Sequence, residues 1–289
     1  MKLYVSASVK RSGDGSPQAP YQTISEAAQA AMPGDEVLVL PGFYREWVDP
    51  KNGGAGEDQR ITYRSQVPGG AVITGAEVIK SWQPYQGGVW VARVSNGLFG
   101  DYNPYTTLIE GDWYVPQKPF HTGEVYLNGK SLYESEDLEG VLDPQVDKAS
   151  WDPAFTVYRW YTCQEGDCTV LYANFHGADP NRENVEINVR RNCFYPSKTG
   201  VNYITLSGFV IRQAATQWAP PTAYQEGMVG PHWAKGWIME DCEISDSKCS
   251  GISLGKYLQP ENDNKWLHKK YKDGTQTERE CICLAQIQG

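Results

Sequence analysis

The stretch YITLSGFVIR, residues 203–212, is repeated in pattern by GWIMEDCEIS, residues 236–245. Both contain two short runs in which apolar residues alternate with others, separated by a tight turn, which is typical of β-strands with one buried face. The two stretches align without a gap, so Leu206 corresponds to Met239. We therefore expect strands stacked in parallel, with Leu206 beside Met239 in the core.

The spacing between these stretches predicts a projecting loop. They begin 33 positions apart, at Tyr203 and Gly236. Two short strands with their turns need only about 20 to 25 residues. The surplus predicts an outward loop at residues 219–233, APPTAYQEGMVGPHW.

Residues 21–34, YQTISEAAQAAMPG, carry the clearest helical signal in the chain. Apolar residues recur every three or four positions from Ile24 onward, and Thr23 with Glu26 form a capping box at the start. Short strand-like runs broken by Gly and Pro follow. One helix and then only strands predict a helix that caps the N-terminal end of a β-stack.

The middle of the chain, residues 81–184, differs in character. Strand-like runs such as GEVYLNGKSLY are separated by long polar turns, and the pair Asn128-Gly129 is a strong hairpin signal. We expect an inserted antiparallel, β-sandwich-like module here. The division is then 1–80 for the cap helix and first strands, 81–184 for the insert and 185–289 for the resumed stack. One continuous irregular β domain is the alternative.

Composition excludes several classes of function. The chain has 289 residues and a net charge of −9, which argues against a nucleic-acid partner. No apolar run is long enough to span a membrane and the start lacks a signal peptide, so we expect a cytoplasmic protein. Seven Cys without a CxxC pair argue against a disulfide framework or zinc ribbon. No metal or cofactor is expected, because the His residues have no ligand spacing.

The last residues, ECICLAQIQG, end in an apolar run without a polar cap. Stacked strands need covered ends. We therefore expect the front portion of a longer protein, and an uncovered end also favours association into a homo-oligomer.

Several segments resemble glycoside hydrolase family 120. The resemblance runs from about Tyr4 to Lys256 and is most specific in the W-A-P-P-T and G-P-x-W-x-K-G-W patterns. The segments that carry it are GDEVLVLPGFYREWVDPK, GDWY, GEVYLNGKSLYE, YANFHGADPNRENVEINVRRNCFYP and AATQWAPPTAYQEGMVGPHWAKGWIMEDCEISDSKCSGISLGK. The family consists of β-xylosidases, and the resemblance implies an all-β, right-handed parallel β-helix of the pectate-lyase-like superfamily, interrupted by the insert.

The resemblance assigns no catalytic residue to this chain. The family's aspartate nucleophile and glutamate acid/base lie beyond the point where the chain ends. Retaining glycosidases need two carboxyl groups about 5 to 5.5 Å apart. The densest carboxylate group here is Glu240, Asp241, Glu243 and Asp246, which we expect at the solvated surface, with a role in a site as the alternative. Arg212 and Lys256 are the cations considered for a polar groove, and we expect both to be surface charges.

Four residues are candidates for binding sugar. Trp218, His232 and Trp233 bracket the loop, and Trp113 lies in the insert's GDWY. Indole faces pack on the apolar C–H faces of pyranosides, and histidine supplies a hydrogen-bond partner for a hydroxyl. A loop packed by its own aromatic residues is the alternative.

The sequence thus favours a retaining exo-β-xylosidase that acts on xylo-oligosaccharides in xylan degradation, with this chain alone inactive. One rival is a polysaccharide lyase of the β-helix class, which requires cationic or Ca²⁺ neutralisation of a uronate. The other is a non-catalytic carbohydrate-binding β-solenoid.

Overall fold

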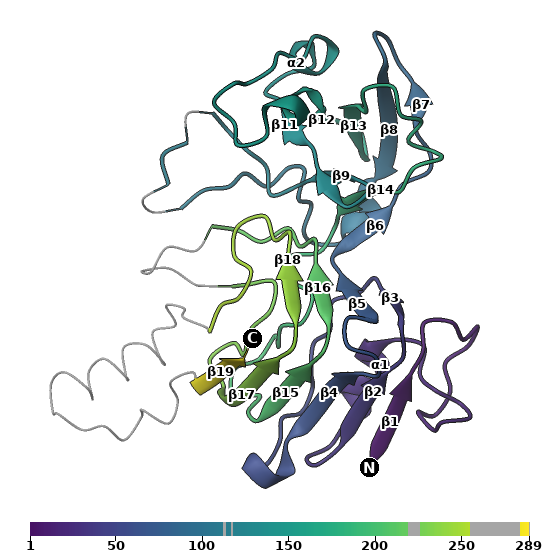
Figure 1. The fold of residues 1–289 in the computed structure, drawn as a ribbon, viewed down its shortest axis with the longest axis vertical. Helices are drawn as coiled ribbons and strands as arrows, with labels where there is room; N and C mark the ends of the chain where they lie inside the picture. Colours follow the sequence, from purple (N-terminus) through teal and green to yellow (C-terminus); the bar gives the residue numbers. More distant parts are fainter. Residues whose placement is uncertain (112–113, 117, 219–225, 255–283, 289) are drawn as a thin grey trace, which may run out of the picture. The chain divides into compact units, whose positions relative to one another are not determined.

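The computed structural model describes residues 1–111, 114–116, 118–218, 226–254 and 284–288. They form two compact units (Figure 1). The first unit contains Met1–Gly75, Gly111 and the described residues from Asn192 onward, and the second contains Ala76–Glu110 and the described residues from Tyr114 to Arg191.

The first unit is built from parallel strands. Its larger sheet has six strands in the order β1 (Lys2–Val5), β2 (Glu36–Val39), β4 (Ile61–Ser65), β15 (Ile204–Ser207), β17 (Lys235–Glu240) and β19 (Leu284–Gln288) (Figure 1). A second sheet has four strands in the order β18 (Glu243–Ser245), β16 (Val210–Arg212), β5 (Ala71–Thr74) and β3 (Gly42–Tyr44). Every pairing in both sheets is parallel.

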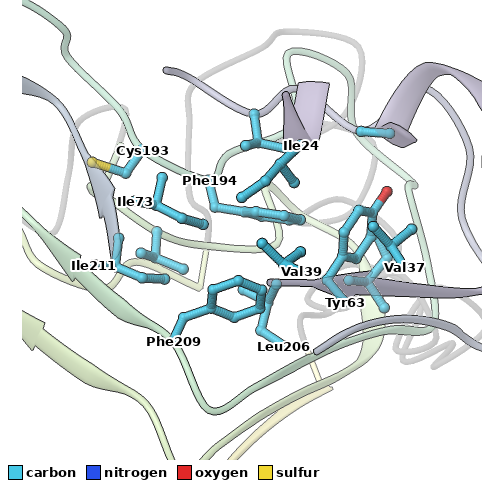
Figure 2. Close-up of a cluster of buried hydrophobic side chains, with 14 of the residues drawn as sticks. Ile24, Val37, Val39, Tyr63, Ile73, Cys193, Phe194, Leu206, Phe209 and Ile211 are labelled. Atoms are coloured by element: carbon cyan, nitrogen blue, oxygen red, sulfur yellow. The ribbon is translucent and has the colours of Figure 1, made fainter. Parts of the chain in front are cut away.

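The core of this unit is formed by the alternate, inward-facing residues of both sheets. Leu206 pairs with Met239 on one side and with Tyr63 on the other, which confirms the expected Leu206–Met239 neighbours. Figure 2 shows Leu206 and Tyr63 packed with Phe194 and Ile24 in one apolar cluster. The rings of Tyr63 and Phe194 meet edge to face at 5.0 Å between centroids.

Residues outside the strands of the two sheets form a column of parallel bridges. Single parallel bridges join Val48 to Phe194, Phe194 to Val229, and Val229 to Ile252. Each residue of this column comes from a segment far from the next in sequence. The bridges therefore bring residues near 48, 194 and 230 together.

Helix α1 (Ile24–Ala30) confirms the helical signal, although it is shorter than residues 21–34. The Thr23 hydroxyl accepts a hydrogen bond from the Glu26 N–H at 3.2 Å, and the Glu26 carboxylate accepts one from the Thr23 N–H at 3.0 Å. The Glu46 carboxylate accepts two more, from the N–H groups of Ile24 at 2.8 Å and Ser25 at 2.7 Å. These bonds fix where the helix begins.

The second unit contains two further sheets. One has four strands in the order β10 (Lys130–Ser131), β9 (Val125–Leu127), β14 (Val185–Asn188) and β6 (Ala76–Val78). The other has five, in the order β11 (Tyr133–Glu134), β12 (Arg159–Glu165), β13 (Cys168–Asn174), β8 (Val89–Ser95) and β7 (Gln83–Pro84). Pairings are antiparallel except that of β11 with β12. Short helices complete the two units: η1 (Glu57–Gln59) in the first, and η2 (Asn96–Phe99), α2 (Glu139–Leu142) and η3 (Pro153–Val157) in the second.

The hairpin predicted at Asn128-Gly129 is confirmed. It joins β9 to β10, with φ of 51° at Asn128 and 85° at Gly129. Such values are those of a two-residue turn that matches the twist of its strands. In the next hairpin, Cys168 faces Glu165 and Cys163 faces Val170, and both thiols are free.

The prediction of an all-β, right-handed parallel β-helix with a cap helix and a sandwich-like insert is wrong. The described strands are divided among four separate sheets, in which parallel and antiparallel pairings both occur, and no single β-helix is formed. Alternation and register report only which residues are neighbours in adjacent strands. They do not determine how the strands are connected and grouped into sheets. The division at residues 81 and 184 stays a prediction.

Candidate functional site

The candidate site is the segment 226–234 of the first unit, which lies between two other chain segments. Its Met228 N–H donates to the Ser250 carbonyl at 2.9 Å, and its Met228 carbonyl accepts from the Cys193 N–H at 2.9 Å. A β-carbon placed on Gly230 would lie 2.0 Å from the Ser253 carbonyl oxygen. Only glycine permits backbones to approach this closely.

His232 and Trp233, within this segment, have strained conformations. Their φ angles are 47° and 62°, a region that side-chain-bearing residues rarely adopt and that costs of order 1–3 kcal/mol per residue. Such strain persists only where surrounding contacts impose it, and it is concentrated at functional sites.

The imidazole of His232 is held by two contacts. Its Nδ1 lies 2.6 Å from the Pro196 carbonyl oxygen, and its ring stacks on that of Tyr195 at 5.1 Å between centroids. A carbonyl can only accept, so Nδ1 carries the proton and Nε2 holds the lone pair in the neutral ring. Burial lowers the pKa of His232, while the Pro196 carbonyl and the carboxylates of Glu226 and Asp49 act in the opposite direction. The ring is therefore neutral at pH 7.

Trp47 belongs to the same neighbourhood, although sequence reasoning missed it. Its indole N–H donates to the Tyr195 carbonyl at 2.8 Å, and 43% of the residue is exposed. Asp49 accepts a bond from the Ser197 N–H at 2.8 Å. The signal was present, because GFYREWVDP belongs to one of the segments that carry the resemblance to glycoside hydrolase family 120. What the sequence could not show is the bridge between Val48 and Phe194 that brings this segment to Tyr195.

The four predicted sugar-binding residues have different outcomes. His232 lies beside Tyr195 and Pro196, and Trp233 follows it directly in the chain. Trp218 is 37% exposed at the end of a described segment. Trp113 lies outside the described residues. No observation tests their binding of sugar, which stays a prediction.

The carboxylate group runs from Glu240, the last residue of β17, to Asp246, directly after β18. Glu240 lies 3.9 Å from the Arg64 guanidinium. Asp241 and Asp246 have φ angles of 52° and 56°, and burial raises the pKa of Asp246. Arg212 lies over the Phe43 ring at 5.6 Å, and Lys256 lies outside the described residues.

In the part of the chain that the structure describes, no group of three His, Cys, Asp or Glu side chains is arranged to hold a metal ion. Within the same residues, no helix has both the length and the apolar character needed to cross a membrane.

Comparisons with known proteins point to one class of enzyme. Residues 79–187 match the glycoside hydrolase 120 insertion domain. The complex structure of XylC with xylose is 44% identical, with a TM-score of 0.86, and the match covers 97% of this chain and 46% of that one. A second structure, described as a glycoside hydrolase, is 13% identical over 87% of this chain and 63% of its own, with a TM-score of 0.53, and shows likeness of fold alone.

One curated protein also matches over a short stretch. The uncharacterized protein YwoF of Bacillus subtilis (strain 168) is 32% identical over 76 residues, which are 26% of this chain and 16% of that protein. The chain thus spans less than half the length of XylC and a small part of YwoF. It is similar to glycoside hydrolases of family 120, whose insertion domain matches its residues 79–187.

Proposed function

We propose that this chain is part of a retaining exo-β-xylosidase that releases xylose from xylo-oligosaccharides. The observation that carries the proposal is the 44% identity, over 97% of the chain, to a structure of XylC in complex with xylose. The match of residues 79–187 to the glycoside hydrolase 120 insertion domain supports the same class of enzyme. A neutral substrate is also compatible with the net charge of −9.

The proposed chemistry is a double displacement. A carboxylate attacks the anomeric carbon and displaces the aglycone, whose oxygen takes a proton from a second carboxyl group; water then releases the sugar. The family resemblance places both groups in residues without a counterpart here. We therefore expect sugar binding but no turnover by these 289 residues alone.

The proposed sugar contacts are Trp113, Trp218, His232 and Trp233. Trp218 is 37% exposed, and Trp47, whose indole N–H bonds the Tyr195 carbonyl, is 43% exposed. The neutral His232 has its Nδ1 proton bonded to Pro196, which leaves Nε2 as the acceptor side of the ring. This polarity suits a sugar hydroxyl as donor.

Calorimetry of the complete chain tests the binding. Xylobiose should bind more tightly than cellobiose, and Trp218→Ala should weaken xylobiose binding by about fivefold, the equivalent of one lost stacking contact. Equal affinity for the two disaccharides, or none for either, contradicts the proposal.

Hydrolysis of 4-nitrophenyl β-xyloside tests the assignment of the catalytic groups. The 289-residue chain should release no xylose. The assignment is contradicted if the purified chain releases xylose and substitution of one of its own carboxylates abolishes that release. Cytoplasmic location and self-association also stay predictions.

A further inference from the structure

Trp151, in the second unit, is the most exposed aromatic residue that the structure describes. It is 86% exposed, whereas Trp218 is 37% exposed. A tryptophan contributes 150–250 Å² of contact surface when it is buried, so an indole left in water contributes almost nothing to folding. Trp151 is therefore available for binding.

The residues on either side of Trp151 are anchored. The Ser150 hydroxyl lies 2.9 Å from the Tyr133 hydroxyl and also accepts a bond from the Asp152 N–H at 3.3 Å. The Asp152 carboxylate forms an ion pair with Lys130. Because both neighbours are tied to the protein, the indole between them is displayed in a defined place.

The rest of this loop, residues 147–158, is held by its own hydrogen bonds. Thr156 is buried, and its hydroxyl accepts from the Asp147 N–H at 2.9 Å and donates to the Pro153 carbonyl at 2.7 Å. The Asp147 carboxylate accepts from the Ala149 N–H at 2.9 Å. A loop ordered before binding loses little entropy when a ligand arrives.

The loop also contains stacked aromatic rings and one member of an ion pair. The Phe155 and Tyr158 rings stack at 4.3 Å with an angle of 14°, and the Lys130 ammonium lies 3.9 Å from the Phe155 centroid. The Lys130–Asp152 pair is thus close to the aromatic rings and offers both a donor and an acceptor. Phe155 and Tyr158 pack against the buried core, so the exposed face of the loop is the Trp151 indole, next to Asp152 in the chain. An exposed indole beside hydrogen-bonding groups suits ligands with apolar faces and polar edges.

The size and charge of this surface favour a sugar over a protein. A stable protein interface buries about 800 Å² on each partner, several times what one indole provides. The area of contact that two sugar rings need is closer to the area that one indole covers. Repulsion from the net charge of −9 disfavours polyanions.

We propose that Trp151 and its loop bind the sugar rings of a neutral β-linked polysaccharide, specifically xylan. The choice of xylan rests on the proposed function. The loop would give the chain a second sugar-binding segment, in addition to Trp218, His232 and Trp233, and would hold the polymer from which short substrates are cut.

Retention of the complete 289-residue chain on insoluble β-1,4-xylan tests this inference. Trp151→Ala should weaken retention by about fivefold, and Trp151→Tyr should stay within about twofold because it keeps an aromatic face. Val146→Ala is the matched control, since it removes another exposed apolar side chain, 51% exposed, from the adjoining stretch. It should bind as the parent does.

Three outcomes of these measurements overturn the inference. Equal retention of the parent chain and Trp151→Ala does so, as does a parent chain that xylan does not retain. If retention is equal and light scattering shows that Trp151→Ala converts a dimer to a monomer, the indole makes a protein contact instead. Xylobiose calorimetry separates the two proposals: binding of xylan through Trp151 without any binding of xylobiose contradicts the proposed function alone.

Discussion

Two loops of this chain present aromatic residues in opposite ways. The segment 226–234 buries His232, which is 8% exposed, in a strained backbone pressed against Ser253 and Tyr195. The loop 147–158 exposes Trp151 at 86% on a backbone held by local hydrogen bonds. Changes in the first loop should therefore alter folding and binding together, whereas in the second a side chain can be removed with an effect on binding alone.

Gly230→Ala should have the largest effect on stability. The added β-carbon would lie 2.0 Å from the Ser253 carbonyl oxygen, so two backbone segments must separate. We expect the free energy of unfolding to fall by about 3 kcal/mol in urea denaturation. Gly56→Ala is the control, because nothing lies within 4 Å of a β-carbon there, and it should change stability by less than about 0.5 kcal/mol. Equal effects would show that the close approach is not rigid.

His232→Asn should have the next largest effect. Asparagine tolerates a positive φ but loses the stack on Tyr195 and the Nδ1 bond to Pro196, so we expect a loss of about 1.5 kcal/mol at pH 7.5. His176→Asn, at φ of 51° but exposed, controls for the backbone and should be nearly neutral.

The same variant has a pH dependence of definite sign. Because burial lowers the pKa of His232 below its ordinary value of 6.5, the unfolded state binds more protons as pH falls below 6.5. The parent chain should lose stability through that window, and the loss should end below the folded-state pKa. His232→Asn should lack this component, so its difference from the parent should shrink as the solution becomes acidic. A difference that grows would contradict burial of the neutral ring.

Thr156→Val should have a smaller effect on stability and a clear effect on binding. It removes the hydroxyl that bonds the Asp147 N–H and the Pro153 carbonyl, at a cost of about 1 kcal/mol. If the loop binds because it is ordered in advance, retention on xylan should weaken although Trp151 is intact. Unchanged retention would show that the indole alone suffices.

Trp151→Ala should have the smallest effect on stability. The side chain is already in water, so the midpoint of urea denaturation should move by less than about 0.5 kcal/mol in equivalent free energy. A loss above about 2 kcal/mol would show that the indole packs against the protein in solution.

The sequence predicted local features better than overall architecture. The capping box at Thr23 and Glu26, the turn at Asn128-Gly129 and the Leu206–Met239 neighbours depend on nearby residues or on strand alternation, and all are confirmed. The prediction of a β-helix was wrong, because the grouping of strands into sheets depends on connections that the alternation of apolar residues does not encode.

At the candidate site, prediction from the sequence was limited by contacts between residues far apart in the chain. His232 and Trp233 were found because unusual residues bracket an expected loop. Trp47 was missed, because its bond to Tyr195 spans 148 positions of sequence. The display of Trp151 was also missed, since exposure depends on where Ser150 and Asp152 are anchored.

The most direct test of the account follows the indole N–H signals in a nuclear magnetic resonance titration of the complete chain with xylose. Single Trp→Phe variants assign the signals. The account predicts that those of Trp218 and Trp233 shift with one common dissociation constant, and that galactose, with an axial hydroxyl, leaves them in place. Signals that do not move at saturating xylose, or that move equally with galactose, would contradict it.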